Sequence, residues 1–251
     1  MNTLQIIPLK HIGDITTSTH LAETIFTALK KQSLQLENND ILVITQKIVS
    51  KAEGRIVNLQ EIKPSEFAKK LAKKNKKEAA HIEVILRESK RIVRMDHGVI
   101  ISETHHGFIC ANAGVDESNV GNNKTVTLLP IDPDTSAKNI FKDLSKLSTI
   151  KNFGIIISDT WGRPWREGQV NFAVGVCGLS PLIDYRGEKD TYGYTMKASI
   201  IAIADELACA AELVCGKTDN IPAAIIRGYV FDQKEGNGKL LLRDPSLDMF
   251  R

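Results

Sequence analysis

The chain has 251 residues, of which 42% are hydrophobic and 25% are charged, a composition typical of a folded globular protein and unlike that of a disordered or collagen-like chain. Its formal net charge is only +3. A balance this small argues against a general polyanion binder such as a nucleic-acid-coating protein, although the pI of about 8.6 allows a local basic site for phosphates.

The amino terminus and the cysteines favour a reducing compartment. The first ten residues lack the basic and apolar regions of a signal peptide, and no apolar run approaches the roughly 18 residues that a membrane helix needs. The four cysteines form no CxxC pair, so we expect free buried thiols rather than disulfides or a zinc site. We therefore expect a cytoplasmic protein that has no membrane partner.

The first half of the chain predicts a buried strand, a long helix and a hairpin. The apolar run 41–44 is typical of a buried strand. A proline at 64 and spaced apolar residues predict a helix from Pro64 to about Lys90, with its lysines on a solvated face. Residues 99–102 and 108–110 flank a turn at Gly107, which favours a β-hairpin.

The second half mixes further strands and helices without a steady βαβ alternation. The patterns predict strands at 126–129, 154–158, 170–177 and 223–227, a helix capped by 134–136 that runs to 147, and an Ala-rich helix from 198 to 215. We therefore expect an α+β fold with a mixed, largely antiparallel sheet and packed helices. We treat 1–251 as a single unit, with a division into two lobes as an alternative, and 232–251 as a polar C-terminal tail.

Several common catalytic motifs are absent from the sequence. There is no GxxxxGK[ST] phosphate loop, because Ala211 stands where Gly216-Lys217-Thr218 would need an earlier glycine. GxGxxG, HExxH and GxSxG are also missing. These absences argue against a P-loop nucleotidase, Rossmann-type dinucleotide binding, a zinc protease and an α/β-hydrolase.

A first polar segment, 45–55, follows the strand at 41–44. Lys47, Lys51 and Arg55 recur at four-residue spacing and would share one face of a helical turn. A cationic face at a strand end can hold phosphate oxygens. The alternative is a set of surface lysines on a turn.

A second polar segment, 112–119, gathers oxygen-bearing side chains around a glycine. Asn112, Asp116, Glu117 and Asn119 are ligands that a hard cation such as magnesium prefers. An Asx-type turn would explain the same residues without a metal.

A third polar segment, 158–168, places Asp159 and Thr160 at the end of an apolar strand, where sites are often built. It also holds both tryptophans of the chain and two arginines, a combination that can stack a planar ring and clamp a carboxylate or phosphate. A purely structural loop is the alternative. Together, the three segments suggest phosphoryl chemistry on a nucleotide without a P-loop.

Longer stretches of the chain resemble one family. The segments VSKAEGRIV (49–57), CANAGVDESNV (110–120), IISDTWGRPWREGQVNFAVG (156–175), KDTYG (189–193), ADELA (204–208) and IPAAIIRG (221–228) are similar, in this order, to those of the coenzyme F-420-0:gamma-glutamyl ligase family. The resemblance implies an intertwined homodimer of α+β subunits. It also implies a ligase that uses GTP, magnesium or manganese, and potassium to join L-glutamate to the carboxylate of F-420-0, with a second, γ-linked glutamate as a further step.

The resemblance also implies roles for particular residues. It assigns the metal to Asp116, Asp159 and Thr160, and the nucleotide to Ile12, Gly13, Asp14, Ile15, Gln46, Lys47, Lys51 and Asn119. We further expect Arg163 and Arg166 to act in catalysis by holding the carboxylates of the incoming glutamate or the acyl phosphate.

Two positions depart from the family pattern. The family commonly has Glu or Gln, a contributor to the metal site, where this chain has Lys217. A charged lysine cannot ligate magnesium, so either one metal is lost or Lys217 replaces a cation. The family also often has Ser-Thr where Gln46-Lys47 stands, which leaves the choice between GTP and ATP open.

Two rival functions remain open at this point. The same ligase chemistry could act on a folate or dihydropteroate acceptor, since a pterin ring would also suit Trp161 and Trp165. The protein could instead be a non-catalytic nucleotide-binding protein, because Lys217 alters the metal site.

Overall fold

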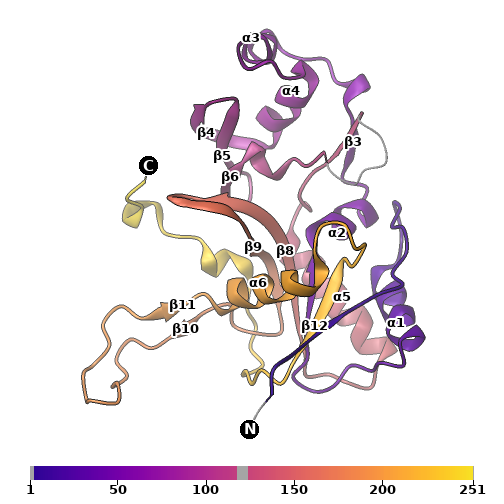
Figure 1. The fold of residues 1–251 in the computed structure, drawn as a ribbon, viewed down its shortest axis with the longest axis vertical. Helices are drawn as coiled ribbons and strands as arrows, with labels where there is room; N and C mark the ends of the chain where they lie inside the picture. Colours follow the sequence, from indigo (N-terminus) through magenta and orange to yellow (C-terminus); the bar gives the residue numbers. More distant parts are fainter. Residues whose placement is uncertain (1–2, 118–123, 251) are drawn as a thin grey trace.

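The computed structural model describes residues 3–117 and 124–250, so Asn119, assigned above to the nucleotide, lies outside the described residues. Its centre is a five-stranded sheet in the order β1-β12-β2-β8-β9 (Figure 1). These strands are β1 (Gln5–Pro8), β2 (Ile41–Thr45), β8 (Gly154–Arg163), β9 (Arg166–Cys177) and β12 (Ala223–Arg227). β2 and β8 are parallel, and the other neighbouring pairs are antiparallel. The predicted α+β class with a mixed, largely antiparallel sheet is confirmed.

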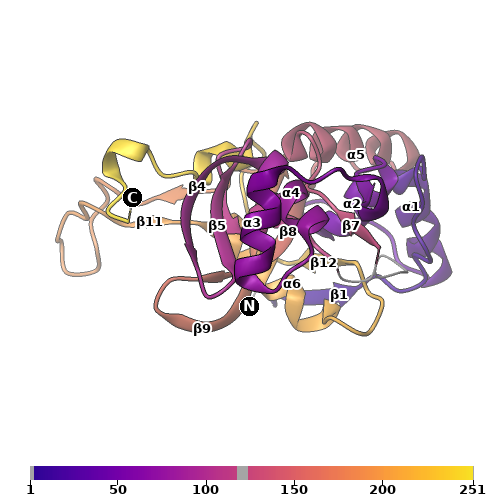
Figure 2. The same ribbon diagram turned by 90° about the horizontal axis from the view of Figure 1, so that it is seen from above.

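Helices cover both faces of this sheet (Figure 1; Figure 2). The covering helices are α1 (Leu21–Lys31), α5 (Pro133–Leu147) and α6 (Ile203–Cys215). Along β2, Leu42 and Ile44 belong to the core shared with α1 and α5, whereas Ile41 and Val43 belong to the core shared with α6. Because both faces are buried, the strand is an unbroken apolar run, as its sequence predicted.

A third apolar core lies outside the central sheet, beneath the helices at the top of Figure 1. The elements of this region are β3 (Ile56–Asn58), α3 (Glu66–Asn75), α4 (Ala79–Glu88), β4 (Ser89–Asp96), β5 (Val99–Thr104), β6 (Ile109–Ala111) and β7 (Thr125–Thr127). The predicted hairpin is confirmed as the antiparallel pair β5–β6. The single helix predicted for 64–90 is wrong, because Lys76 adopts a left-handed conformation (φ 52°) that separates α3 from α4.

The boundaries of the two later helices also differ from the prediction. The side chain of Asp132 accepts a hydrogen bond from the Thr135 amide and so caps α5, two residues before the predicted Asp134. Asp134 instead accepts hydrogen bonds from the amides of Val176 and Gly238, which ties the C-terminal segment to β9. α6 begins at Ile203 and not at residue 198, because β11 (Ile200–Ile201) pairs with β10 (Ile183–Asp184).

Short helical turns complete the described chain. They are α2 (Gln46–Ala52) and the 3-10 turns at Leu59–Glu61, Asn112–Gly114, Gly238–Leu241 and Pro245–Leu247. Within residues 3–117 and 124–250, no helix is both long enough and apolar enough to cross a membrane.

The segment 158–168, expected to be a loop, is a long hairpin. β8 continues past its apolar half to Arg163, and β9 begins at Arg166, so the two strands pair almost to their turn. A register shift between Ile157 and Ser158 marks a bulge where the apolar half of β8 ends. Bulges of this kind re-aim side chains next to a site, and Asp159 follows directly. In Figure 1 the hairpin extends from the sheet toward the C-terminal segment.

Candidate active site

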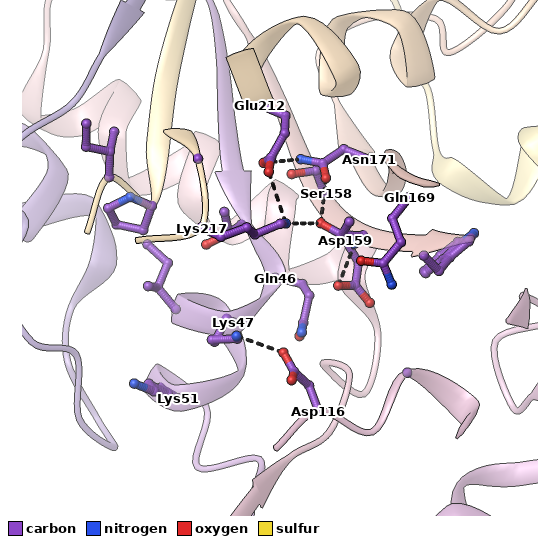
Figure 3. Close-up of a pocket in the computed structure, with 18 of the residues that line it drawn as sticks. Gln46, Lys47, Lys51, Asp116, Ser158, Asp159, Gln169, Asn171, Glu212 and Lys217 are labelled. Carbon is purple, nitrogen blue, oxygen red and sulfur yellow. Dashed lines mark hydrogen bonds and ion pairs between the residues drawn. The ribbon is translucent and has the colours of Figure 1, made fainter. Parts of the chain in front are cut away.

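A cavity of about 790 Å³ lies at the carboxyl ends of the parallel strands β2 and β8. Thr45 and Ser158, the last paired residues of these two strands, both line it. Further walls come from residues 13–15, α2, the segment 111–116, β9 and the turn after α6 (Figure 3). Ligands commonly bind outside the carboxyl ends of parallel strands, so this cavity is the candidate active site.

The lysines of α2 form one wall of the cavity. Because α2 begins directly after β2, Lys47 lies at the strand end, and its Nζ is 2.7 Å from Oδ2 of Asp116. Lys51 lies one helical turn later and also lines the cavity. Arg55 does not join them, because its guanidinium donates to the Leu129 carbonyl at 2.9 Å and to Glu88 at 2.8 Å. The predicted cationic face therefore consists of the two lysines, and its extension to Arg55 is wrong.

Two carboxylates approach the cavity from different elements. Asp116 is held by backbone hydrogen bonds in both directions with Thr127 of β7. Asp159 is half-buried at the polar end of β8, and its Oδ1 accepts a hydrogen bond from the Thr160 amide at 2.8 Å. Figure 3 shows Asp116 next to Lys47, whereas Asp159 lies near Gln169 and Lys217.

Burial raises the pKa of Asp159 from its ordinary value of 3.8 to about 7. The negative charge of Asp116 raises this pKa further, whereas the Thr160 amide and the positive charges of Lys47 and Lys217 lower it. A raised pKa means that the ionised form of Asp159 is unfavourable in the cavity. A cation bound beside the carboxylate would stabilise that ionised form. The pair Asp116 and Asp159 is therefore the part of the cavity best suited to a positive ion.

Four side chains form a hydrogen-bonded network on the other side of Asp159. The Thr160 hydroxyl donates to Oδ1 of Asn171 at 2.5 Å, and Nδ2 of Asn171 donates to Glu212 at 3.1 Å. The ammonium of Lys217 donates to Oγ1 of Thr160 at 2.6 Å and lies 3.1 Å from Oε1 of Glu212. Lys217, which follows the glycine at the end of α6, thus points into the site (Figure 3).

Sequence reasoning missed Asn171 and Glu212. Asn171 lies directly opposite Thr160 in the β8–β9 register, which could be found only by extending the hairpin beyond its apolar half. Glu212 is a carboxylate in the last turn of an Ala-rich helix, four residues before Gly216. An acidic side chain so close to the end of an apolar helix could have been singled out from the sequence as a candidate site residue.

The residues predicted to bind the nucleotide divide into two groups. Gly13, Asp14, Ile15 and Gln46 line the cavity together with the two lysines. The side chain of Ile12 instead packs in the apolar core with 5% of its surface exposed.

The residues at the hairpin tip lie apart from the cavity. Arg163 donates to the Gly168 carbonyl at 3.2 Å, and neither it nor Arg166 is among the residues that line the cavity. Trp165 is 82% exposed and meets only Phe250 among the described aromatic rings. Trp161, by contrast, lines the cavity and stacks on Phe172 with 5.0 Å between the ring centroids.

The donor set fits a divalent ion only together with a phosphorylated ligand. Among the described residues, no group of three or more His, Cys, Asp and Glu side chains could enclose a metal. Magnesium, however, commonly binds through one or two carboxylates plus the phosphate oxygens of a substrate. Asp116 and Asp159 provide such a pair. Lys47 pairs with Asp116 and Lys51 lines the same cavity, so both can neutralise phosphates bound there.

The chain is similar to known proteins over almost its whole length. Residues 11–228 match the model of the family described as F420-0:Gamma-glutamyl ligase. The chain is 48% identical to the coenzyme F420:L-glutamate ligase of Methanothermobacter thermautotrophicus over 98% of this chain and 96% of that protein. It is 43% identical to the enzyme of the same name from Methanopyrus kandleri (99% and 98% covered), and 35% identical to that from Archaeoglobus fulgidus (99% and 96% covered).

Proposed function

We propose that this chain, which belongs to the F420-0:gamma-glutamyl ligase family, joins L-glutamate to the carboxylate of coenzyme F420-0 and uses GTP to do so. The observation that supports this most is the convergence of two lysines and two carboxylates in one cavity at the ends of β2 and β8. Such a set suits the phosphate chain of a nucleotide and the charge that develops during phosphoryl transfer. A second glutamate, joined by its amine to the γ-carboxylate of the first, is part of the same proposal.

The chemistry requires activation of the acceptor carboxylate, because hydroxide is too poor a leaving group for direct attack by an amine. An oxygen of the F420-0 carboxylate attacks the γ-phosphorus of GTP, the bond to the bridging oxygen breaks, and GDP leaves. The glutamate nitrogen then attacks the acyl carbon of the resulting acyl phosphate. This attack requires the neutral amine, so the glutamate ammonium first loses one proton to solvent. Inorganic phosphate leaves with the bonding electrons and takes up the second proton, which the nitrogen releases as the amide forms.

The residues of the cavity would divide this work between them. Lys47 and Lys51 hold phosphate oxygens, and their positive charges stabilise the transferring group. Asp116 and Asp159 would hold magnesium or manganese, which when bound neutralises charge on the phosphates. Trp161 provides an apolar wall on which a planar ring can stack. Potassium as a further cation is proposed on the family resemblance alone.

The arginines and the oligomeric state are linked in this proposal. Arg163 and Arg166 would bind the carboxylates of glutamate. Because both lie at the tip of the β8–β9 hairpin and outside the cavity of their own chain, that role requires a contact between chains. A homodimer in which the hairpin reaches the partner would supply it.

A dihydropteroate acceptor is the second candidate, since the wall formed by Trp161 would accept a pterin as well as a deazaflavin. The experiment incubates purified protein with magnesium, L-glutamate, GTP or ATP, and either F420-0 or dihydropteroate, and detects products by mass spectrometry. We expect glutamylated F420-0 with GTP. Product from dihydropteroate alone would establish the second candidate, and GTP binding without product from either acceptor would establish a non-catalytic role.

A further inference from the structure

Lys217 lies within the cavity network and has two fixed partners. It follows Gly216, whose positive φ of 58° ends α6 and directs the chain back toward β8. Its ammonium lies 2.6 Å from Oγ1 of Thr160 and 3.1 Å from Oε1 of Glu212. The contact with Glu212 anchors the ammonium and so restricts the conformations of the long Lys217 side chain.

The hydroxyl of Thr160 has its hydrogen directed away from Lys217. Oδ1 of Asn171 can only accept, so the hydroxyl hydrogen points to it across 2.5 Å. The orientation of that amide is itself set, because Nδ2 of Asn171 donates to Glu212 at 3.1 Å and Asn171 is only 3% exposed. The oxygen lone pairs of Thr160 therefore face the ammonium of Lys217, which can only donate.

This arrangement leaves Thr160 a poor ligand for a divalent ion. An ion bound at about 2.1 Å from Oγ1 would lie within roughly 4 to 5 Å of the ammonium nitrogen. At that separation the repulsion between a doubly and a singly charged cation exceeds what one neutral hydroxyl ligand contributes. An ion beside Asp116 and Asp159 also meets the positive charge of Lys217, which lowers the pKa of Asp159, but there two carboxylates supply the negative charge that a neutral hydroxyl lacks.

We infer that Lys217, anchored by Glu212, is the cation that serves the Thr160 side of the cavity, so that this protein binds one divalent ion with its nucleotide and uses an ammonium in place of a second. The inference deepens the proposed function and depends on it, since the phosphate chain is what the ion and the ammonium would share. It also removes Thr160 from the residues expected to ligate metal.

The experiment counts manganese ions bound per site in the presence of the non-hydrolysable β,γ-imido analogue of GTP, by the electron paramagnetic resonance signal of free Mn²⁺. We expect one ion in the unaltered protein and two in Lys217→Glu and Lys217→Gln, because each restores an oxygen ligand beside Thr160. Calorimetric titration of Lys217→Ala should show the analogue binding about 10- to 100-fold more weakly at fixed Mn²⁺, since a charge-assisted contact is lost.

Lys146 offers a matched control. It is 64% exposed, against 61% for Lys217, and it pairs with Asp143 much as Lys217 pairs with Glu212, but it lies outside the cavity. Lys146→Glu and Lys146→Ala should change neither the manganese count nor the affinity for the analogue.

The outcomes separate this inference from the proposed function. Two ions per site in the unaltered protein, or a count that does not rise in either oxygen-bearing variant, would overturn the role of Lys217 while leaving the ligase proposal intact. Failure of the unaltered protein to bind the analogue at all would overturn the proposed function and this inference together.

Discussion

Replacing Asp159 with asparagine should make the protein more stable at alkaline pH while removing its activity. The folded protein holds the proton of this carboxyl up to a pKa of about 7, whereas an unfolded chain releases it near 3.8. Between these two values the folded state binds more protons than the unfolded state, so the unfolding free energy of the unaltered protein falls as pH rises. Asp159→Asn has no proton to release and escapes this loss.

The magnitude follows from the interval between the two pKa values. An interval from 3.8 to about 7 corresponds to about 4 kcal/mol. Water in the cavity reaches part of the half-buried carboxylate, so we expect about 2–4 kcal/mol of added stability at pH 8 and almost none at pH 4. Ligase activity should fall about 10- to 100-fold, because an amide is a much weaker ligand for a divalent ion than a carboxylate.

The assay is urea unfolding of both proteins at several pH values without added metal, followed by circular dichroism. A stability difference that does not grow between pH 4 and pH 8 would refute the reasoning. Asp143→Asn is the control, for which we expect a change of stability of the opposite sign. A hydrogen bond from Lys146 lowers the pKa of Asp143, so replacing Asp143 should slightly destabilise the protein above that pKa.

Three further predictions concern the rest of the molecule. Arg227→Gln should lower the unfolding free energy measured in urea by about 3–5 kcal/mol, because it leaves the fully buried Asp40 without the guanidinium that pairs with it at 2.8 Å. An unchanged unfolding midpoint would show that the pair is dispensable. Lys47→Ala should weaken GTP binding about 10- to 100-fold in calorimetry, and equal affinity would remove Lys47 from the phosphate site. Sedimentation should give twice the protomer mass of 27.7 kDa, and an active monomer would contradict the proposed dimer.

The sequence predicted elements well where burial alone determines them. The strand at 41–44 is apolar throughout because helices cover both of its faces, so its pattern is unambiguous. The break between α3 and α4 was not predictable in the same way. It depends on Lys76 adopting a left-handed conformation, and a lysine in a run of lysines carries none of the signals that glycine or proline would give.

The hairpin illustrates a different limit. β9 is an edge strand, and residues near its turn are exposed, so the polar segment 158–168 shows no apolar alternation. Polar composition therefore suggested a loop where the backbone pairing of β8 and β9 continues. Only the register reveals that Thr160 lies opposite Asn171.

The candidate site was predictable where one short motif holds the residue. Lys47, Asp116 and Asp159 each follow a recognisable strand, and the fold brings their ends together. Glu212 and Asn171 enter the site through packing of α6 against β9, a contact between distant segments that no local pattern encodes. Arg163 and Arg166 show the converse, because a motif that looks catalytic lies outside the cavity of its own chain.

The most direct test of the ligase proposal follows oxygen from the acceptor. Purified protein receives F420-0 labelled with ¹⁸O in its carboxylate, together with L-glutamate, magnesium and GTP, and mass spectrometry examines both the phosphate and the pigment. An acyl-phosphate ligase transfers one ¹⁸O to the released phosphate and forms a glutamyl amide that retains the other. Unlabelled phosphate, or labelled F420-0 recovered without glutamate, would contradict the account.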